Sequence, residues 1–174
     1  MICICDREAD IYEFFVEAQE MPFVMRAAQD RVVDNDVVRL RALAESLPVA
    51  GEFSIQVAAR GAQPAREATL SVSFTKTTLL PPHRSQASRS QELPAVEIYL
   101  VWVIETNPPD GTTPVEWLLL TNVKVTDFSD AIERVDWYTQ RWHIEVYSKS
   151  SNQERKLRKS ASKPKRDSYA LLPC

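Results

Sequence analysis

The chain has 174 residues, of which 44% are hydrophobic and 26% are charged, and its formal net charge is -3. This length suits one domain with a core, or one domain carrying a large insertion, and it excludes a complete multidomain enzyme. The composition excludes a wholly disordered or fibrous chain.

Charge is unevenly distributed along the chain. From residue 147 onward, eight Lys and Arg residues stand against two acidic residues, a net +6 that leaves -9 on the rest. A basic tail on an acidic body can hold a polyanion, but such a run is more often simply solvated. Charge alone leaves both interpretations open.

The sequence predicts a cytoplasmic protein without a membrane partner. Its longest apolar run, residues 96–104, is too short to span a bilayer and contains a glutamate. No basic region or long apolar segment of the signal-peptide type precedes the first predicted strand. Cys3, Cys5 and Cys174 are too few and too badly spaced for a zinc site or a disulfide framework, and the first two fit a buried strand.

The start of the chain predicts a strand, a helix and a second strand. Residues 1–5 form a continuous apolar run, typical of a strand buried on both faces, and this run ends at Asp6. Residues 7–20 place apolar side chains at helical spacing. These side chains are Ile11, Phe14, Phe15 and Ala18. Residues 23–26 predict another buried strand that ends at Arg26, and this succession is typical of the α/β class.

The middle of the chain predicts a short helix followed by β-structure. The helix is expected at 40–47, and a polar loop is expected at 83–92. A turn rich in Pro and Asp-Gly, ending at Gly111, should reverse the chain. Four runs have the alternation or apolar content of strands: 53–57, 68–74, 96–104 and 117–120. We expect these strands to form a small, mostly antiparallel sheet, over residues 51–122, inserted into the α/β body.

A final helix is predicted from Asp127 to about Lys149. Within it, Tyr138, Arg141 and Glu145 follow at spacings of three and four, so the three polar groups project from one helical face. An ordinary Arg–Glu pair on a solvated face is the alternative. Beyond the helix apolar residues become scarce, and we expect the basic tail at 150–174 to be disordered.

Four separated segments occur in the order and at the intervals of one family: 6–12, 23–26, 117–121 and 138–145. On these segments, the chain resembles the bacterial insertion-sequence DDE transposases that carry a YREK signature, over residues 1–149. The resemblance implies a partial RNase H-like core from residues 1–50 and the catalytic helix at 123–149, interrupted by the β-rich insertion. It also implies metal-dependent DNA cleavage and strand transfer, with double-stranded transposon ends and a second transposase molecule as partners.

The resemblance assigns two metal ligands. Asp6 and Glu145 correspond to the second and third of three catalytic carboxylates that hold Mg²⁺ or Mn²⁺. Such ions activate a water or a DNA 3′-hydroxyl and stabilise the leaving oxygen in phosphoryl transfer. Asp6 is also explained as the N-cap of the helix that follows it, and the two roles are compatible.

The resemblance also assigns contacts with DNA. Tyr138 and Arg141 correspond to a pair that contacts backbone phosphate, the arginine through its two-pronged guanidinium. Trp117 and Arg26 correspond to residues that handle a base flipped out of the duplex, the tryptophan by stacking on it. Trp117 is equally explained as part of the core of its sheet.

The sequence departs from the family in three places. The family's first catalytic Asp lies on a strand upstream of the one that ends at Asp6, so one ligand is missing. Asn152 replaces the last Lys of the signature, and Lys149 on the same helical face is the candidate substitute for DNA contact. After residue 148 the resemblance ends, which suggests a frameshift.

These departures predict a transposase fragment that does not catalyse strand transfer alone, because positioning supplies much of the rate in this chemistry. One alternative is a non-catalytic DNA-binding remnant that interferes with an intact transposase. Another is a chain that is not stably folded, because an exposed sheet edge favours aggregation.

Overall fold

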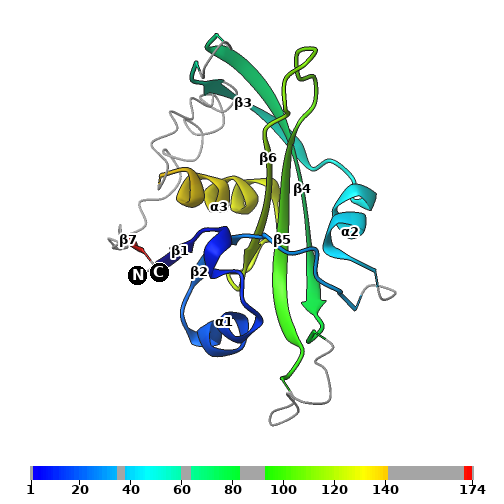
Figure 1. The fold of residues 1–174 in the computed structure, drawn as a ribbon, viewed down its shortest axis with the longest axis vertical. Helices are drawn as coiled ribbons and strands as arrows, with labels where there is room; N and C mark the ends of the chain where they lie inside the picture. Colours follow the sequence, from blue (N-terminus) through cyan, green and yellow to red (C-terminus); the bar gives the residue numbers. More distant parts are fainter. Residues whose placement is uncertain (1, 35–37, 60–63, 83–92, 141–170, 174) are drawn as a thin grey trace, which may run out of the picture.

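One mixed sheet with helices on both faces makes up the fold in a computed structural model of the chain (Figure 1). The structure describes residues 2–34, 38–59, 64–82, 93–140 and 171–173. The predicted loop at 83–92, the end of the predicted late helix and most of the predicted disordered tail lie outside these residues. None of the described helices has the length and apolar character that crossing a bilayer requires.

The predicted strand–helix–strand unit at the start of the chain is confirmed. β1 (Ile2–Cys5) and β2 (Phe23–Arg26) are parallel neighbours. The chain crosses from one to the other through the 3-10 helix η1 (Arg7–Ala9), α1 (Tyr12–Glu17) and the 3-10 helix η2 (Ala18–Glu20). All four residues of β1 are buried, as their apolar run predicts.

Antiparallel strands make up the rest of the sheet. They are β3 (Gly51–Val57), β4 (Arg66–Leu79), β5 (Val96–Glu105) and β6 (Glu116–Thr121). β6 also pairs antiparallel with β2, which gives the order β3-β4-β5-β6-β2-β1. The short β7 (Leu171–Pro173) lies parallel to β1 at the edge, so the disorder expected over 150–174 is wrong for these three residues. The chain is therefore of the mixed α/β class, and its β-rich segment shares one sheet with the α/β unit.

The four predicted β-runs all form strands, and the predicted turn reverses the chain between β5 and β6. Gly111 in this turn has φ of 74°, a conformation that favours glycine. β4 is longer than its alternating segment at 68–74, because both β3 and β5 pair with it and satisfy its backbone groups.

Each face of the sheet has its own core. α1 and α2 (Leu40–Ser46) pack on one face, and α3 (Phe128–Gln140) packs on the other. In Figure 1 the long strands run between α2 and α3. β1 contributes Cys3 and Cys5 to the α1 face and its two isoleucines to the α3 face, which confirms the buried position expected of both cysteines. Cys5 is a free thiol, but Cys3 is disulfide-bonded, so the expectation of a purely packing role is wrong for Cys3.

α3 begins where two acidic side chains cap it. Asp127 accepts a hydrogen bond from the backbone N–H of Asp130 at 2.9 Å, and Asp130 accepts one from the backbone N–H of Thr126, also at 2.9 Å. These reciprocal bonds satisfy N–H groups that have no partner inside the helix. The start of the predicted late helix is therefore confirmed, and the helix is described as far as Gln140.

The segment between β1 and α1 differs from the single helix predicted at 7–20. The helical run is interrupted at Asp10, and Ile11, expected on the apolar face, is 56% exposed. Phe15 and Ala18 are buried as predicted, and Tyr12 is buried in place of Ile11. The interruption arises because the side chain of Asp10 turns inward and binds the loop that follows β2.

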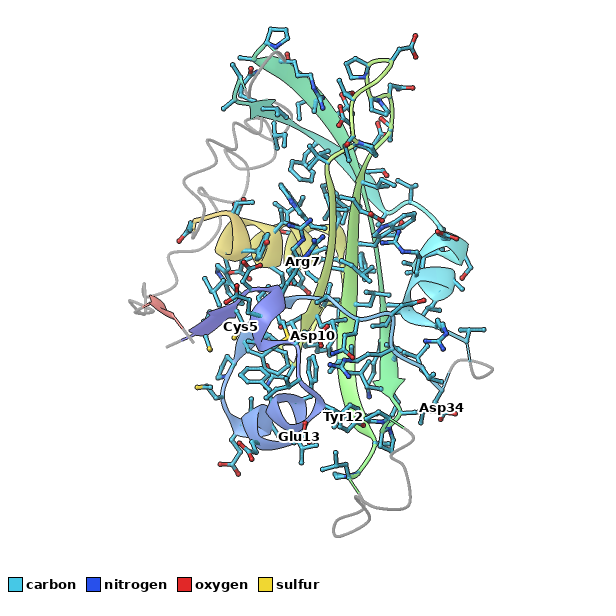
Figure 2. The ribbon with its side chains drawn as sticks, in the orientation of Figure 1. Cys5, Arg7, Asp10, Tyr12, Glu13 and Asp34 are labelled. Atoms are coloured by element: carbon cyan, nitrogen blue, oxygen red, sulfur yellow. The ribbon has the colours of Figure 1, made fainter. Side chains whose placement is uncertain are left out.

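Asp10 joins the two ends of the strand–helix–strand unit and lies between η1 and the long strands (Figure 2). Its buried carboxylate accepts hydrogen bonds from the backbone N–H groups of Ala28 and Gln29, both at 2.7 Å. It also forms an ion pair with Arg31 at 2.5 Å. A buried charge is costly unless it is paired and hydrogen bonded, and Asp10 is both. This pair therefore fixes the loops that follow β1 and β2.

Replacing Asp10 with Asn should lower the free energy of unfolding by about 3–5 kcal/mol, because Arg31 would remain buried without a counter-charge. The double variant Asp10→Asn, Arg31→Met should recover part of this loss, because it removes the unpaired charge. Chemical denaturation measures both effects. The control Asp34→Asn, at an exposed position, should change the unfolding free energy by less than about 0.5 kcal/mol. An Asp10→Asn protein as stable as this control would contradict the account.

Candidate metal and nucleic-acid site

The carboxyl ends of β1 and β2 lie side by side, because the strands are parallel and Cys5 pairs with Met25. Asp6, directly after β1, and Arg26, the last residue of β2, therefore come at the same edge of the sheet. In α/β proteins, ligands commonly bind at the carboxyl ends of parallel strands. This edge is the candidate site.

Asp6 has the position and the freedom of a ligand. Its backbone is extended, with φ of -94° and ψ of 178°, so it continues the alternation of Ile2 and Ile4 on the α3 face. It occupies the N-cap position of η1, but its side chain makes no capping hydrogen bond. Among the described residues, its partly exposed carboxylate has no hydrogen-bond or ion-pair partner. The capping role considered for Asp6 is therefore wrong, and the carboxylate is available.

One carboxylate does not make a Mg²⁺ or Mn²⁺ site, because these ions take several oxygen ligands. Within the described ranges, no group of three or more His, Cys, Asp or Glu side chains is arranged to hold a metal ion. The nearby Asp10 is committed to Arg31. Glu145, the expected second ligand, lies outside the described residues, and the described donors do not complete a site by themselves.

Of the residues expected to contact DNA, two lie outside the described ranges and two are buried in the core. Arg141 and Lys149 lie outside the described residues. Trp117 on β6 and Tyr138 on α3 pack against each other, with their ring centroids 6.0 Å apart, and are only 5% and 1% exposed. Trp117 therefore has the core role that the sequence left open. Contact of either ring with DNA would require a movement that exposes it.

The side chain of Arg26 extends to the neighbouring strand β6. Its Nη2 donates a hydrogen bond to the carbonyl oxygen of Glu116 at 2.9 Å. Arg26 lines a pocket of about 150 Å³ together with Arg7, Arg41 and Glu116. None of these three residues was predicted from the sequence to belong to the site. Arg7 could have been found from its position directly after the predicted ligand Asp6. Arg41 has no such signal in the sequence, because its position depends on how α2 packs.

Glu116 is the acidic centre of this pocket. Arg41 holds its carboxylate with two hydrogen bonds, Nη1 to Oε1 at 2.7 Å and Nη2 to Oε2 at 3.3 Å. The indole N–H of Trp102 also donates to Oε1, at 3.1 Å. Burial acts to raise the pKa of Glu116, but the hydrogen bonds from Arg41 and Trp102 outweigh it and hold the pKa below the ordinary 4.5. Glu116 is therefore ionised at neutral pH.

The lowered pKa of Glu116 makes this contact pH-dependent. A carboxyl group whose pKa is lower in the folded chain stabilises the fold above its unfolded pKa, and this contribution is lost as the pH falls through the folded pKa. Glu116→Gln should therefore reduce the loss of unfolding free energy between about pH 5 and pH 3. The reduction should not exceed about 1 kcal/mol, because the Arg41 side chain is 52% exposed.

Denaturation at a series of pH values measures this difference in slope. Glu52→Gln, at an exposed position of β3, is the matched control and should keep the pH slope of the wild type. If Glu116→Gln also kept that slope, the ion pair with Arg41 would not contribute to stability.

No protein-family model matches the chain. A family assignment consequently depends on the four sequence segments and on where the fold places their described residues.

Proposed function

We propose that this chain carries part of the catalytic core of a DDE transposase, in which Asp6 and Glu145 supply carboxylates to a shared Mg²⁺ or Mn²⁺ site. The placement of Asp6 is the observation that carries the proposal. This acid directly follows the first strand of a parallel strand–helix–strand unit, and its partly exposed carboxylate has no partner among the described residues. Such a unit is compatible with an RNase H-like core.

The position of α3 supports the same proposal. α3 packs on the face of the sheet formed by Ile2 and Ile4, the face on which the alternation of β1 places Asp6. The predicted late helix begins with α3 and includes Glu145 in its sequence. α3 is described as far as Gln140, and Glu145 follows five residues later in the sequence.

The bound ions would supply activation of a water or a DNA 3′-hydroxyl. The residues of the chain would position the DNA, with Arg26, Arg141 and Lys149 as cations for its phosphates. Only two of the family's three carboxylate positions are matched by acids in these 174 residues. We therefore expect this polypeptide to bind duplex DNA without cutting it.

A second candidate function, DNA binding without any chemistry, is favoured by the burial of Trp117 and Tyr138. With these two aromatic side chains packed in the core, the proposed DNA contacts that remain are the cations, and cations bind backbone phosphate without reading sequence. Such a chain would act by competing with, or associating with, an intact transposase.

The 174-residue chain should bind duplex DNA in low salt, and its affinity should fall steeply as salt is added, because phosphate contacts release counterions. Arg26→Ala should weaken binding by roughly tenfold and lower the salt slope by about one. Fluorescence anisotropy at several salt concentrations measures both. Lys124→Ala, at an exposed position before α3, is the charge-matched control.

Incubating the same samples with Mg²⁺ and analysing the DNA for cut strands distinguishes the two candidate functions. Binding without cleavage is expected of the 174-residue chain. Cleavage that is lost in Asp6→Asn would show that the two acids suffice for chemistry, contrary to our expectation. Absence of salt-sensitive binding would remove both candidate functions.

A further inference from the structure

Three arginines from three different elements converge on the pocket beside the end of β2. Arg7 comes from η1, Arg26 from β2 and Arg41 from α2. Two acidic residues, Asp30 and Glu116, line the same pocket of about 150 Å³. Three cations against two anions leave the lining with a net positive charge.

The two acids of the pocket already have partners. Asp30 accepts a hydrogen bond from the backbone N–H of Arg41 at 3.0 Å, near the start of α2. Glu116 is held by the guanidinium of Arg41 and by the indole of Trp102. The guanidinium groups of Arg7 and Arg26 are therefore the cations that these acids neutralise least.

These two guanidinium groups retain unused donors. In the described part of the chain, the exposed side chain of Arg7 has no hydrogen-bond or ion-pair partner. Arg26 uses Nη2 for the carbonyl of Glu116, and no other side-chain hydrogen bond of Arg26 is formed among the described residues. The N–H groups of guanidinium match the oxygens of a phosphate in geometry and charge.

We propose that this pocket binds a phosphate group, with Arg7 and Arg26 as its main donors and Glu116 as an internal competitor that otherwise occupies Arg41. Phosphate binding by the pocket stands independently of the transposase assignment. That the phosphate belongs to a DNA backbone rests on the proposed function. Free phosphate is the other source of the same chemistry.

The competing role of Glu116 follows from its contacts. Its carboxylate offers Arg41 the two-pronged acceptor that a phosphate would offer. An incoming phosphate must either displace this carboxylate or bind beside a negative charge, and both weaken binding. Neutralising Glu116 should therefore strengthen phosphate binding.

Titration of inorganic phosphate into ¹⁵N-labelled protein tests the proposal, with chloride at matched ionic strength as the reference. Phosphate should shift the side-chain Nε–H signals of Arg7 and Arg26, which are assigned from their loss in Arg7→Gln and Arg26→Gln. Arg7→Gln should weaken phosphate binding by about tenfold, the effect of one charge-assisted hydrogen bond. Glu116→Gln should tighten it several-fold.

Lys124→Gln removes an exposed cation away from the pocket and is the control for general charge effects. Thermal unfolding of each variant checks that the fold is kept. If phosphate left the Arg7 and Arg26 signals unchanged, or if Lys124→Gln weakened binding as much as Arg7→Gln, the pocket would not be a phosphate site.

A duplex oligonucleotide of arbitrary sequence distinguishes the two sources. DNA that shifts the same arginine signals, and competes with inorganic phosphate, supports a backbone phosphate as the ligand. Shifts with inorganic phosphate alone would support the pocket and count against its assignment to DNA, and so against the proposed function.

Discussion

The buried ion pair between Asp10 and Arg31 is the constraint on which the candidate site depends. Asp10 follows η1, and its carboxylate binds the backbone of the loop after β2. The two loops are therefore tied together at the sheet edge that carries Asp6 and Arg26. Because an unpaired charge at this depth costs several kcal/mol, the edge is held in one arrangement. A ligand site built from two loops needs such a tie, since loops are otherwise the most mobile part of a fold.

β6 contributes residues both to the arginine pocket and to the core under α3. Successive residues of a strand point to opposite faces, so Glu116 faces Arg41 and the pocket while Trp117 packs against Tyr138 under α3. The carbonyl of Glu116 also accepts the hydrogen bond from Arg26. Neighbouring residues of β6 thus contribute to the pocket and to the core under α3. The phosphate pocket and the α3 face on which Asp6 lies therefore share the strand β6.

Much of the fold was predictable, because the apolar runs and alternation of β1 to β6 are local patterns. The break at Asp10 was not, because its partners Ala28 and Arg31 lie 18 and 21 residues further along the chain. Nor was the single continuous sheet, which depends on β6 pairing with β2 across a span of about a hundred residues, as in the Phe23–Asn122 contact with its separation of 99. At the site, the carboxylate of Asp6 has no partner among the described residues, and its role as a metal ligand stays a prediction. The contact of Arg41 with Glu116, 75 residues away, has no local signature.

The proposed function requires Asp6, the acid after β1, and Glu145 to bind one ion together. A double-mutant cycle of Mn²⁺ affinity, followed by the electron paramagnetic resonance signal of free Mn²⁺, tests this most directly. With a shared ion, Asp6→Asn and Glu145→Gln should each weaken binding by at least about tenfold, and the double variant should be little weaker than either single one, because the two changes remove the same site. Additive losses, or an Asp6→Asn protein that binds Mn²⁺ as tightly as the wild type, would contradict the claim.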